Sequence, residues 1–153
     1  MTLAARRPQA VLFACDHNAV RSPMAAGLCR QMFGRAIRVA SAGVCKGELD
    51  TFAVAALGEI GVDIARHRPM TFAELEDWEG FDFDLIVTLS PQAHHAALER
   101  TRAHAAEVEY WVTADPTVID GSREQRLAAY REVRDQLIER IRMRFAAPIG
   151  GNE

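Results

Sequence analysis

A cysteine and an arginine, Cys15 and Arg21, enclose a short stretch between an apolar run and a predicted helix. The stretch reads Cys-Asp-His-Asn-Ala-Val-Arg and follows the apolar residues 10–14. A cysteine thiolate is a strong nucleophile, and a guanidinium offers a planar pair of donors that matches two oxygens of a tetrahedral oxyanion. The positive end of a helix also favours an anion there. The stretch therefore predicts attack by a thiolate on phosphate esters or on a phosphate mimic.

We expect the backbone of this loop to hold the anion, because the amides of a tight turn can donate hydrogen bonds to phosphate oxygens. Arg21 would stabilise the charge that spreads over those oxygens in the transition state. The predicted phosphate-binding residues are Asp16, His17, Asn18, Ala19, Val20, Arg21 and Ser22.

The group that leaves phosphorus needs a proton, and Asp115 is the candidate donor. Ligands of open parallel sheets gather at the carboxyl ends of the strands. The run from Val108 to Val112 leads into Asp115-Pro116, so this carboxyl group is expected at the same edge as Cys15. Attack by Cys15 would give a cysteinyl-phosphate. Asp115 would protonate the leaving group and then deprotonate the water that frees phosphate.

Apolar runs and helical patterns alternate along the chain, which predicts an α/β fold with three layers, α/β/α, around a four-stranded parallel sheet. Ser22 and Pro23 suit the cap and first turn of a helix, and Ser122 with Gln125 forms a capping-box pattern. The predicted strands are Ala10 to Ala14, Ile37 to Ala42, Leu85 to Leu89 and Val108 to Val112. The predicted helices run from Ser22 to Gly34, from Thr51 to Ile60, from Pro91 toward His104 and from Ser122 to Phe145.

The composition is that of an ordinary globular domain. The 153 residues are 49% hydrophobic and 25% charged, and a formal net charge of -3 lacks the basic excess expected of a nucleic-acid binder. No apolar run is long enough to span a membrane, and the first residues do not resemble a signal peptide. Three cysteines at irregular spacing do not predict a disulfide framework. We expect one cytoplasmic domain over residues 1–153, with loose ends at 1–8 and 148–153, no metal and no cofactor.

These motifs resemble the low-molecular-weight protein tyrosine phosphatases and the related thioredoxin-coupled arsenate reductases. The family's loop is a cysteine, five residues, an arginine and a serine, which Cys15 to Ser22 match, and its acid belongs to an Asp-Pro pair, which Asp115-Pro116 match. The resemblance implies that Ser22 donates a hydrogen bond to the Cys15 thiolate. It also implies that Asn18, supported by Ser41, holds the shape of the loop.

The chain departs from the family pattern around this loop. His17 stands where the family commonly has glycine, which predicts a locally different or strained backbone. Val20 replaces the cysteine that protects the nucleophile by disulfide formation in many tyrosine phosphatases, so that switch is expected to be absent. The segment from Val44 to Asp50 lacks the aromatic residue that commonly walls a phosphotyrosine pocket. Trp78 is expected on a loop, where it packs or borders the pocket.

Three functions stay open at the level of sequence. The first is a phosphomonoesterase, for which the resemblance favours a phosphorylated tyrosine in a protein or a small aryl phosphate. The second is arsenate reduction with an external thiol, or with thioredoxin or glutaredoxin as partner, because residues 88–92 lack the further cysteines of the thioredoxin-coupled enzymes. The third is a regulator that binds an oxyanion without catalysis. No nucleic-acid or membrane partner is expected.

Overall fold

The computed structural model describes residues 7–146 and confirms the predicted parallel sheet. Its strands stand in the order β2-β1-β3-β4, and each neighbouring pair is parallel. Their carboxyl ends therefore meet at one edge of the sheet. The strands are β1 (Ala10–Cys15), β2 (Arg38–Gly43), β3 (Leu85–Thr88) and β4 (Glu107–Tyr110), close to the predicted bounds.

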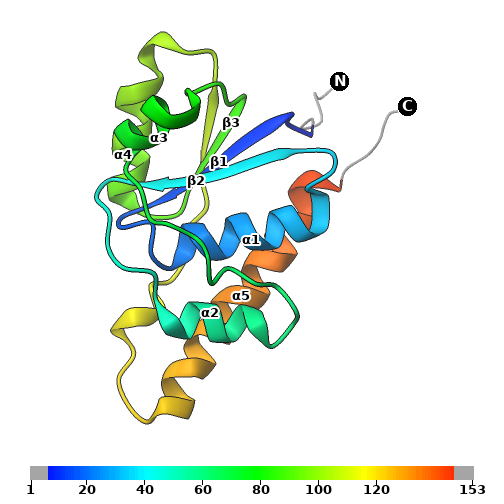
Figure 1. The fold of residues 1–153 in the computed structure, drawn as a ribbon, viewed down its shortest axis with the longest axis vertical. Helices are drawn as coiled ribbons and strands as arrows, with labels where there is room; N and C mark the ends of the chain where they lie inside the picture. Colours follow the sequence, from blue (N-terminus) through cyan, green and yellow to red (C-terminus); the bar gives the residue numbers. More distant parts are fainter. Residues whose placement is uncertain (1–6, 147–153) are drawn as a thin grey trace.

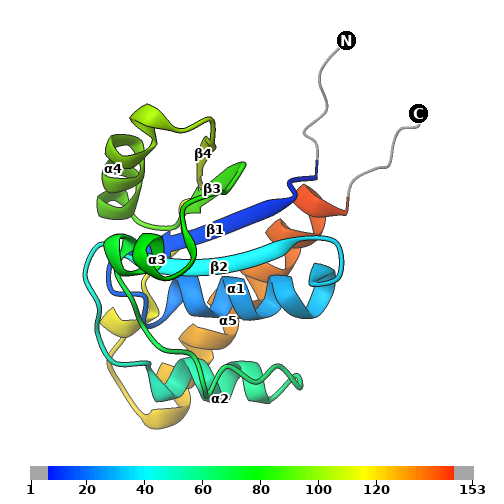
Figure 2. The same cartoon turned by 45° about the horizontal axis from the view of Figure 1, so that its top comes forward.

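Helices cover both faces of the sheet, which confirms the α/β/α architecture (Figures 1 and 2). Side chains of a strand point alternately to its two faces, so Phe13 and Cys15 pack on one side and Leu12 and Ala14 on the other. The first side holds α1 (Arg21–Phe33), α2 (Thr51–Gly58) and α5 (Arg123–Phe145). The second side holds α3 (Phe72–Glu79) and α4 (Pro91–Arg100). Two short 3-10 helices are η1 (Thr101–Ala103) and η2 (Pro116–Val118).

Helix α1 begins at Arg21, one residue before the predicted cap Ser22, because the Ser22 side chain contacts Cys15 and does not cap the helix. Val20 is the residue at the N-cap and makes no side-chain cap bond, whereas Ser22 lies inside the first turn. The Ser22 hydroxyl contacts the Cys15 sulfur at 2.9 Å instead. Gly34 does end the helix as predicted, with its amide donating to the Arg30 carbonyl.

Helix α3 was not among the predicted elements. Thr71 caps it and forms a capping box with Glu74, a pattern that is present in the sequence. Its buried residues are Phe72 and Leu75, so the apolar periodicity that marks a helix is weak. Trp78 lies on this helix with 79% of its side chain exposed, so the expectation that it packs from a loop is wrong.

Helix α5 packs along the predicted apolar stripe, after the predicted capping box of Ser122 and Gln125. The carbonyl of Phe145 near its end accepts a hydrogen bond of 2.8 Å from Arg7. Pro8 is buried, so these two residues of the expected loose start are held. Residues 1–6 and 147–153, the remainder of the predicted loose ends, lie outside the described residues. None of the helices within residues 7–146 is long and apolar enough to cross a membrane.

Candidate active site

The loop after β1 is tied to the segment after β2 through its carbonyl groups. Across a trans peptide bond, the carbonyl of one residue and the amide of the next point in opposite directions. The amides of residues 16, 17, 18 and 20 therefore face away from the second segment and are available to an anion. The hydrogen bonds join the carbonyls of Cys15, Asp16, His17 and Ala19 to the amides of Val44, Cys45, Gly47 and Asp50, at 3.2, 2.8, 2.9 and 3.1 Å.

The close approach of these two segments explains the glycine at position 43. A Cβ atom there would lie 2.7 Å from the Asn18 nitrogen and 2.5 Å from the Cys45 carbonyl oxygen. Both atoms belong to the backbone and cannot give way without moving a segment. Gly43 ends β2 directly after Ser41-Ala42. The glycine of this Ser-Ala-Gly sequence lets the Cys15 loop lie close to the end of β2.

Asn18 lies at the centre of the loop and is fully buried. Its φ angle of 54° places it in the left-handed region, which asparagine tolerates better than most residues. Asn18 is the one non-glycine residue with positive φ among residues 7–146. The backbone strain predicted at His17 is therefore not present as a positive φ angle at that residue. The Asn18 amide nitrogen donates to the hydroxyls of Ser22 and Ser41, at 2.9 Å each.

The other end of the Asn18 side chain accepts two hydrogen bonds. Its oxygen accepts from the Met70 amide at 2.9 Å and lies 3.0 Å from Nε2 of His67. Because Asn18 Nδ2 is used by two hydroxyls, this oxygen must accept, and His67 must carry its proton on Nε2. Burial lowers the pKa of His67, and the Arg30 charge acts in the same direction, against the hydrogen bond to the Asn18 carbonyl. Burial thus favours the neutral form of the ring.

Cys15 is buried at the floor of the loop with 3% exposure. Its sulfur lies 2.9 Å from the Ser22 hydroxyl and accepts a longer bond of 3.4 Å from the Ser22 amide. Asn18 also donates to this hydroxyl, which leaves the hydroxyl proton for the sulfur. Ser22 therefore offers two hydrogen-bond donors to the Cys15 sulfur, one from its hydroxyl and one from its amide.

Arg21 is anchored on one side of its guanidinium. Nη1 donates to the carbonyls of Leu89 and Thr113, at 3.2 and 2.9 Å. Nη2 lies 3.8 Å from a carboxylate oxygen of Asp16, and the other oxygen of Asp16 accepts from Ser90 at 2.6 Å. The two carbonyls lie in the segments after β3 and β4, and Asp16 follows β1, so segments after three strands fix the direction of this side chain.

Asp115 reaches the same pocket from the segment after β4. A pocket of about 140 Å³ is lined by Cys15, Asp16, His17, Ala19, Val20, Arg21, Asp115 and Thr117. One oxygen of Asp115, Oδ1, accepts from the Thr117 amide at 3.0 Å and from its hydroxyl at 2.7 Å. Burial would raise the pKa of Asp115, but these bonds and the charges of Arg21 and His17 lower it below its ordinary value.

The structure therefore gathers Cys15, Arg21 and Asp115 around one pocket, with the residues of the loop as its wall. Asn18, Ser22 and Ser41 form a buried network behind it. The sequence did not reveal Met70 and His67 as partners of Asn18, because they lie 52 and 49 residues further along the chain. Ser90 directly follows a predicted strand, and this position alone could have indicated that it lies near the site.

The other two cysteines differ in their surroundings. Cys29 is buried in α1, and burial raises the pKa of its thiol to about 12, against a smaller effect of Arg30. Cys45 is exposed on the segment beside the Cys15 loop, and its amide donates to Asp16. Within residues 7–146, no group of three or more histidine, cysteine or acidic side chains could hold a metal ion.

Known proteins with similar sequences and structures include arsenate reductases and protein phosphatases. The arsenate reductase of Bacillus subtilis (strain 168) is 32% identical over 133 residues, which cover 86% of this chain and 91% of the relative. An arsenate reductase in its phosphate-binding state superposes with a TM-score of 0.73 and 27% identity, over 90% of this chain and 97% of the other. The low molecular weight protein tyrosine phosphatase from T. tengcongensis superposes with a TM-score of 0.69 and 26% identity, over 86% and 94%.

A family model matches most of this chain. The family model described as low molecular weight phosphotyrosine protein phosphatase matches residues 10–150. That range contains β1 to α5 and all of the loop from Cys15 to Ser22. The chain therefore belongs to the low molecular weight phosphotyrosine protein phosphatase family.

Proposed function

We propose that the protein is a cysteine-dependent phosphomonoesterase that acts on phosphotyrosine in proteins or on small aryl phosphates. The observation that carries the proposal is the shared pocket of a buried cysteine, an anchored arginine and a carboxyl group. Cys15 and Asp115 both line the pocket, and Arg21 has donors left for oxygens because only its Nη1 is bound to carbonyls. A passive anion site would need the arginine and the amides but has no use for a proton donor.

In the first step, the Cys15 sulfur attacks phosphorus and the bond to the ester oxygen breaks. The loop amides and Arg21 hold the three equatorial oxygens, whose charge they neutralise in the transition state. The ester oxygen leaves with a proton from Asp115. Oδ1 of Asp115 is occupied by Thr117, so Oδ2 is the oxygen that transfers the proton. The products are an alcohol or phenol and a phosphate bound to Cys15.

In the second step, Asp115 accepts a proton from water, and the hydroxide attacks the phosphorus of the cysteinyl-phosphate. The bond between sulfur and phosphorus breaks, and inorganic phosphate leaves. The electron pair returns to Cys15 as a thiolate, for which Ser22 provides hydrogen bonds. Asp115 is then protonated again and ready for the next substrate.

Arsenate reduction is the second candidate, favoured by the arsenate reductase of Bacillus subtilis among the relatives. Arsenate has the shape of phosphate, and the Cys15 sulfur would form a bond to arsenic as one As–O bond breaks and that oxygen leaves as water. Its reduction to arsenite needs two electrons, which two thiols supply as they form a disulfide. Cys29 is buried with a raised pKa, and Cys45 stands on the surface. We therefore propose an external thiol or a small thiol protein as the electron donor for this route.

A side-by-side assay separates the functions. Wild-type protein is given an aryl phosphate, a phosphotyrosine peptide, and arsenate with several thiol donors, and Cys15→Ser protein serves as the control. We expect release of phosphate from both esters by wild type and none by the variant. Thiol oxidation that depends on arsenate and Cys15, with no release of phosphate, would replace the first candidate by the second. Binding of phosphate without either reaction would indicate a non-catalytic regulator.

A further inference from the structure

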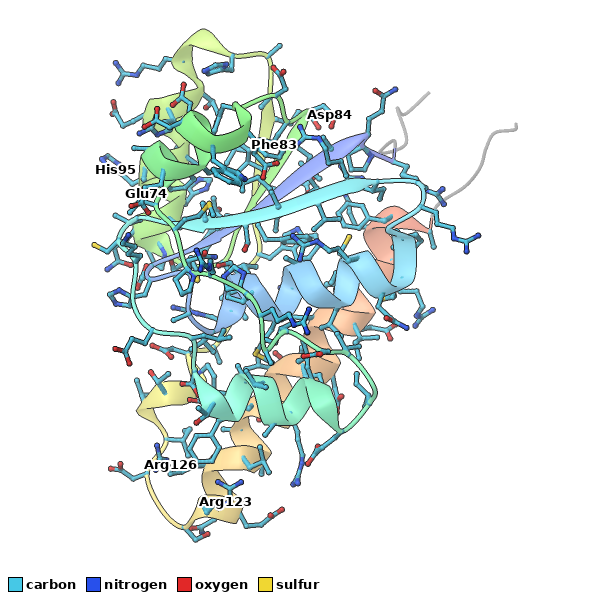
Figure 3. All side chains as sticks on the ribbon, in the orientation of Figure 1. Glu74, Phe83, Asp84, His95, Arg123 and Arg126 are labelled. Carbon is cyan, nitrogen blue, oxygen red and sulfur yellow. The ribbon has the colours of Figure 1, made fainter. Side chains whose placement is uncertain are left out.

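The first turns of α5 carry two exposed arginines that share one aromatic ring. The guanidinium groups of Arg123 and Arg126 lie 5.4 and 4.6 Å from the ring centre of Phe52. Phe52 stacks in turn on Tyr130, with ring centres 5.3 Å apart. Figure 3 shows both arginines at the N-terminal end of α5. A guanidinium stacked on a ring still has N–H groups at its edge that can donate to a carboxylate. It also loses less conformational entropy when it binds a carboxylate, because the ring already restricts the side chain.

Neither arginine has an acidic partner within the described part of the chain. No carboxylate of residues 7–146 lies within 4.0 Å of Arg123 or Arg126. Most of the other arginines of the same helix have acidic partners, as Arg131 does with Glu59 and Glu124. The start of a helix is moreover a place where its dipole disfavours cations. Two positive charges without an ion pair therefore stand there in a chain whose net charge is -3.

This surface is connected to the wall of the candidate active site. Asp50 caps α2, the helix that carries Phe52, and its amide donates to the Ala19 carbonyl at 3.1 Å. The Asp50 carboxylate accepts a bond of 2.7 Å from the Tyr130 hydroxyl. Ala19 itself lines the pocket of Cys15. Hydrogen bonds through Asp50 thus connect the pocket wall to the aromatic pair on which the two arginines lie.

A protein or peptide substrate would extend over this region. Each residue of an extended chain advances by about 3.3 Å, so residues a few positions from the phosphorylated one can reach beyond the pocket wall. We propose that Arg123 and Arg126 form a docking surface for acidic residues near the phosphorylated residue of a substrate. This proposal rests on the proposed phosphatase activity. Exposed charge pairs at the edge of an interface contribute modestly and weaken with salt, so the surface would select substrates without being needed for the reaction.

The test compares two phosphotyrosine peptides, one with aspartate and glutamate on both sides of the tyrosine and one with serine and glutamine there. The variant is Arg123→Gln with Arg126→Gln. Arg142→Gln is the matched control, because Arg142 is exposed on the same helix but is paired with Glu139. An aryl phosphate too small to reach α5 reports the basal activity. Fluorescence anisotropy of both peptides on Cys15→Ser protein measures docking without turnover.

We expect wild type to prefer the acidic peptide in kcat/KM by about tenfold, and the double variant to lose this preference. The aryl phosphate should be hydrolysed equally by both, and Arg142→Gln should behave as wild type. Equal kcat/KM and equal affinity for the two peptides in wild type would overturn the docking surface while leaving the phosphatase activity in place. No hydrolysis of any ester, with tighter binding of the acidic peptide that depends on both arginines, would contradict the activity but support the surface. Binding of phosphatidylserine vesicles through these arginines, without peptide preference, would assign the surface to a membrane and overturn the proposal.

Discussion

The back of the Cys15 loop is almost fully buried, whereas its mouth is largely exposed. Behind the loop, Asn18 and Ser22 are 0% exposed, and the Asn18 side chain has protein partners at both ends. In front of it, Asp115 is half-buried, and the side chain of Val118 is 71% exposed. Both hydrogen bonds to the Asp115 carboxylate come from Thr117, two residues along the chain.

The difference separates two tasks. The back includes contacts of Asn18 with residues far away in the sequence, Ser41, His67 and Met70, so it fixes the shape that an oxyanion needs before the anion arrives. The mouth consists of short-range contacts, so its residues can be replaced without moving the loop. Substitutions at the back should therefore change stability and activity together, and substitutions at the mouth should change only activity.

Asp115→Asn is the strongest test of the mouth. The amide keeps the size of the side chain but cannot donate a proton to the leaving group. We expect kcat for an aryl phosphate with a poor leaving group to fall by about 10²-fold or more, while the free energy of unfolding stays within about 0.5 kcal/mol of wild type. Because a good leaving group needs no proton, the loss should shrink as the pKa of the leaving phenol falls. Equal losses across a series of phenols would contradict a role in protonation.

Asn18→Ala tests the back. The substitution leaves the buried hydroxyls and amides around it without their partner, and alanine is disfavoured at a φ of 54°. We expect the free energy of unfolding, measured in urea, to fall by about 3 kcal/mol, and kcat/KM to fall with it. Asn18→Gly is the matched control, since it removes the same hydrogen bonds but accepts the backbone angle. It should lose about 1 kcal/mol less. Stability equal to wild type in both variants would mean that the network does not hold the loop.

Much of this arrangement follows from sequence, and the remainder shows where sequence patterns are weak. Alternating apolar runs predicted the parallel sheet, and a parallel sheet brings Cys15 and Asp115 to one edge although they are far apart in the chain. Helix α3 was not predicted because only Phe72 and Leu75 are buried, and two apolar residues give too weak a periodicity to mark a helix. The pattern around His67 does not indicate which residue it contacts. The tertiary fold brings His67 to Asn18, and local spacing in the sequence does not indicate this contact.

His67→Gln addresses the pH dependence of the back. Burial lowers the pKa of His67 from 6.5, so the unfolded chain takes up this proton more readily than the folded one. Above the pKa of the unfolded chain, His67 is neutral in both states and the fold keeps its full stability. As pH falls from the unfolded pKa to the lower folded pKa, protonation of the unfolded chain lowers the free energy of unfolding. Glutamine keeps an N–H donor for Asn18 but does not titrate. We expect the variant to lose less stability than wild type between about pH 7.5 and about pH 5.5 in urea unfolding. An identical decline in both proteins would show that His67 does not contribute to it.

Thr117→Val is the smallest change and the most direct probe of the mouth. Valine keeps the shape of threonine and removes the hydroxyl, one of the bonds that lower the pKa of Asp115. The pKa of Asp115 should therefore rise, and the protonated acid should persist to higher pH. We expect the alkaline decline in kcat for an aryl phosphate to move to higher pH, with less than about a threefold change at the optimum. Asp115→Asn in the same background should remove the shift, because there is then no carboxyl group to titrate. A shift that survives this second substitution would belong to another group and would take Asp115 out of the proton transfer.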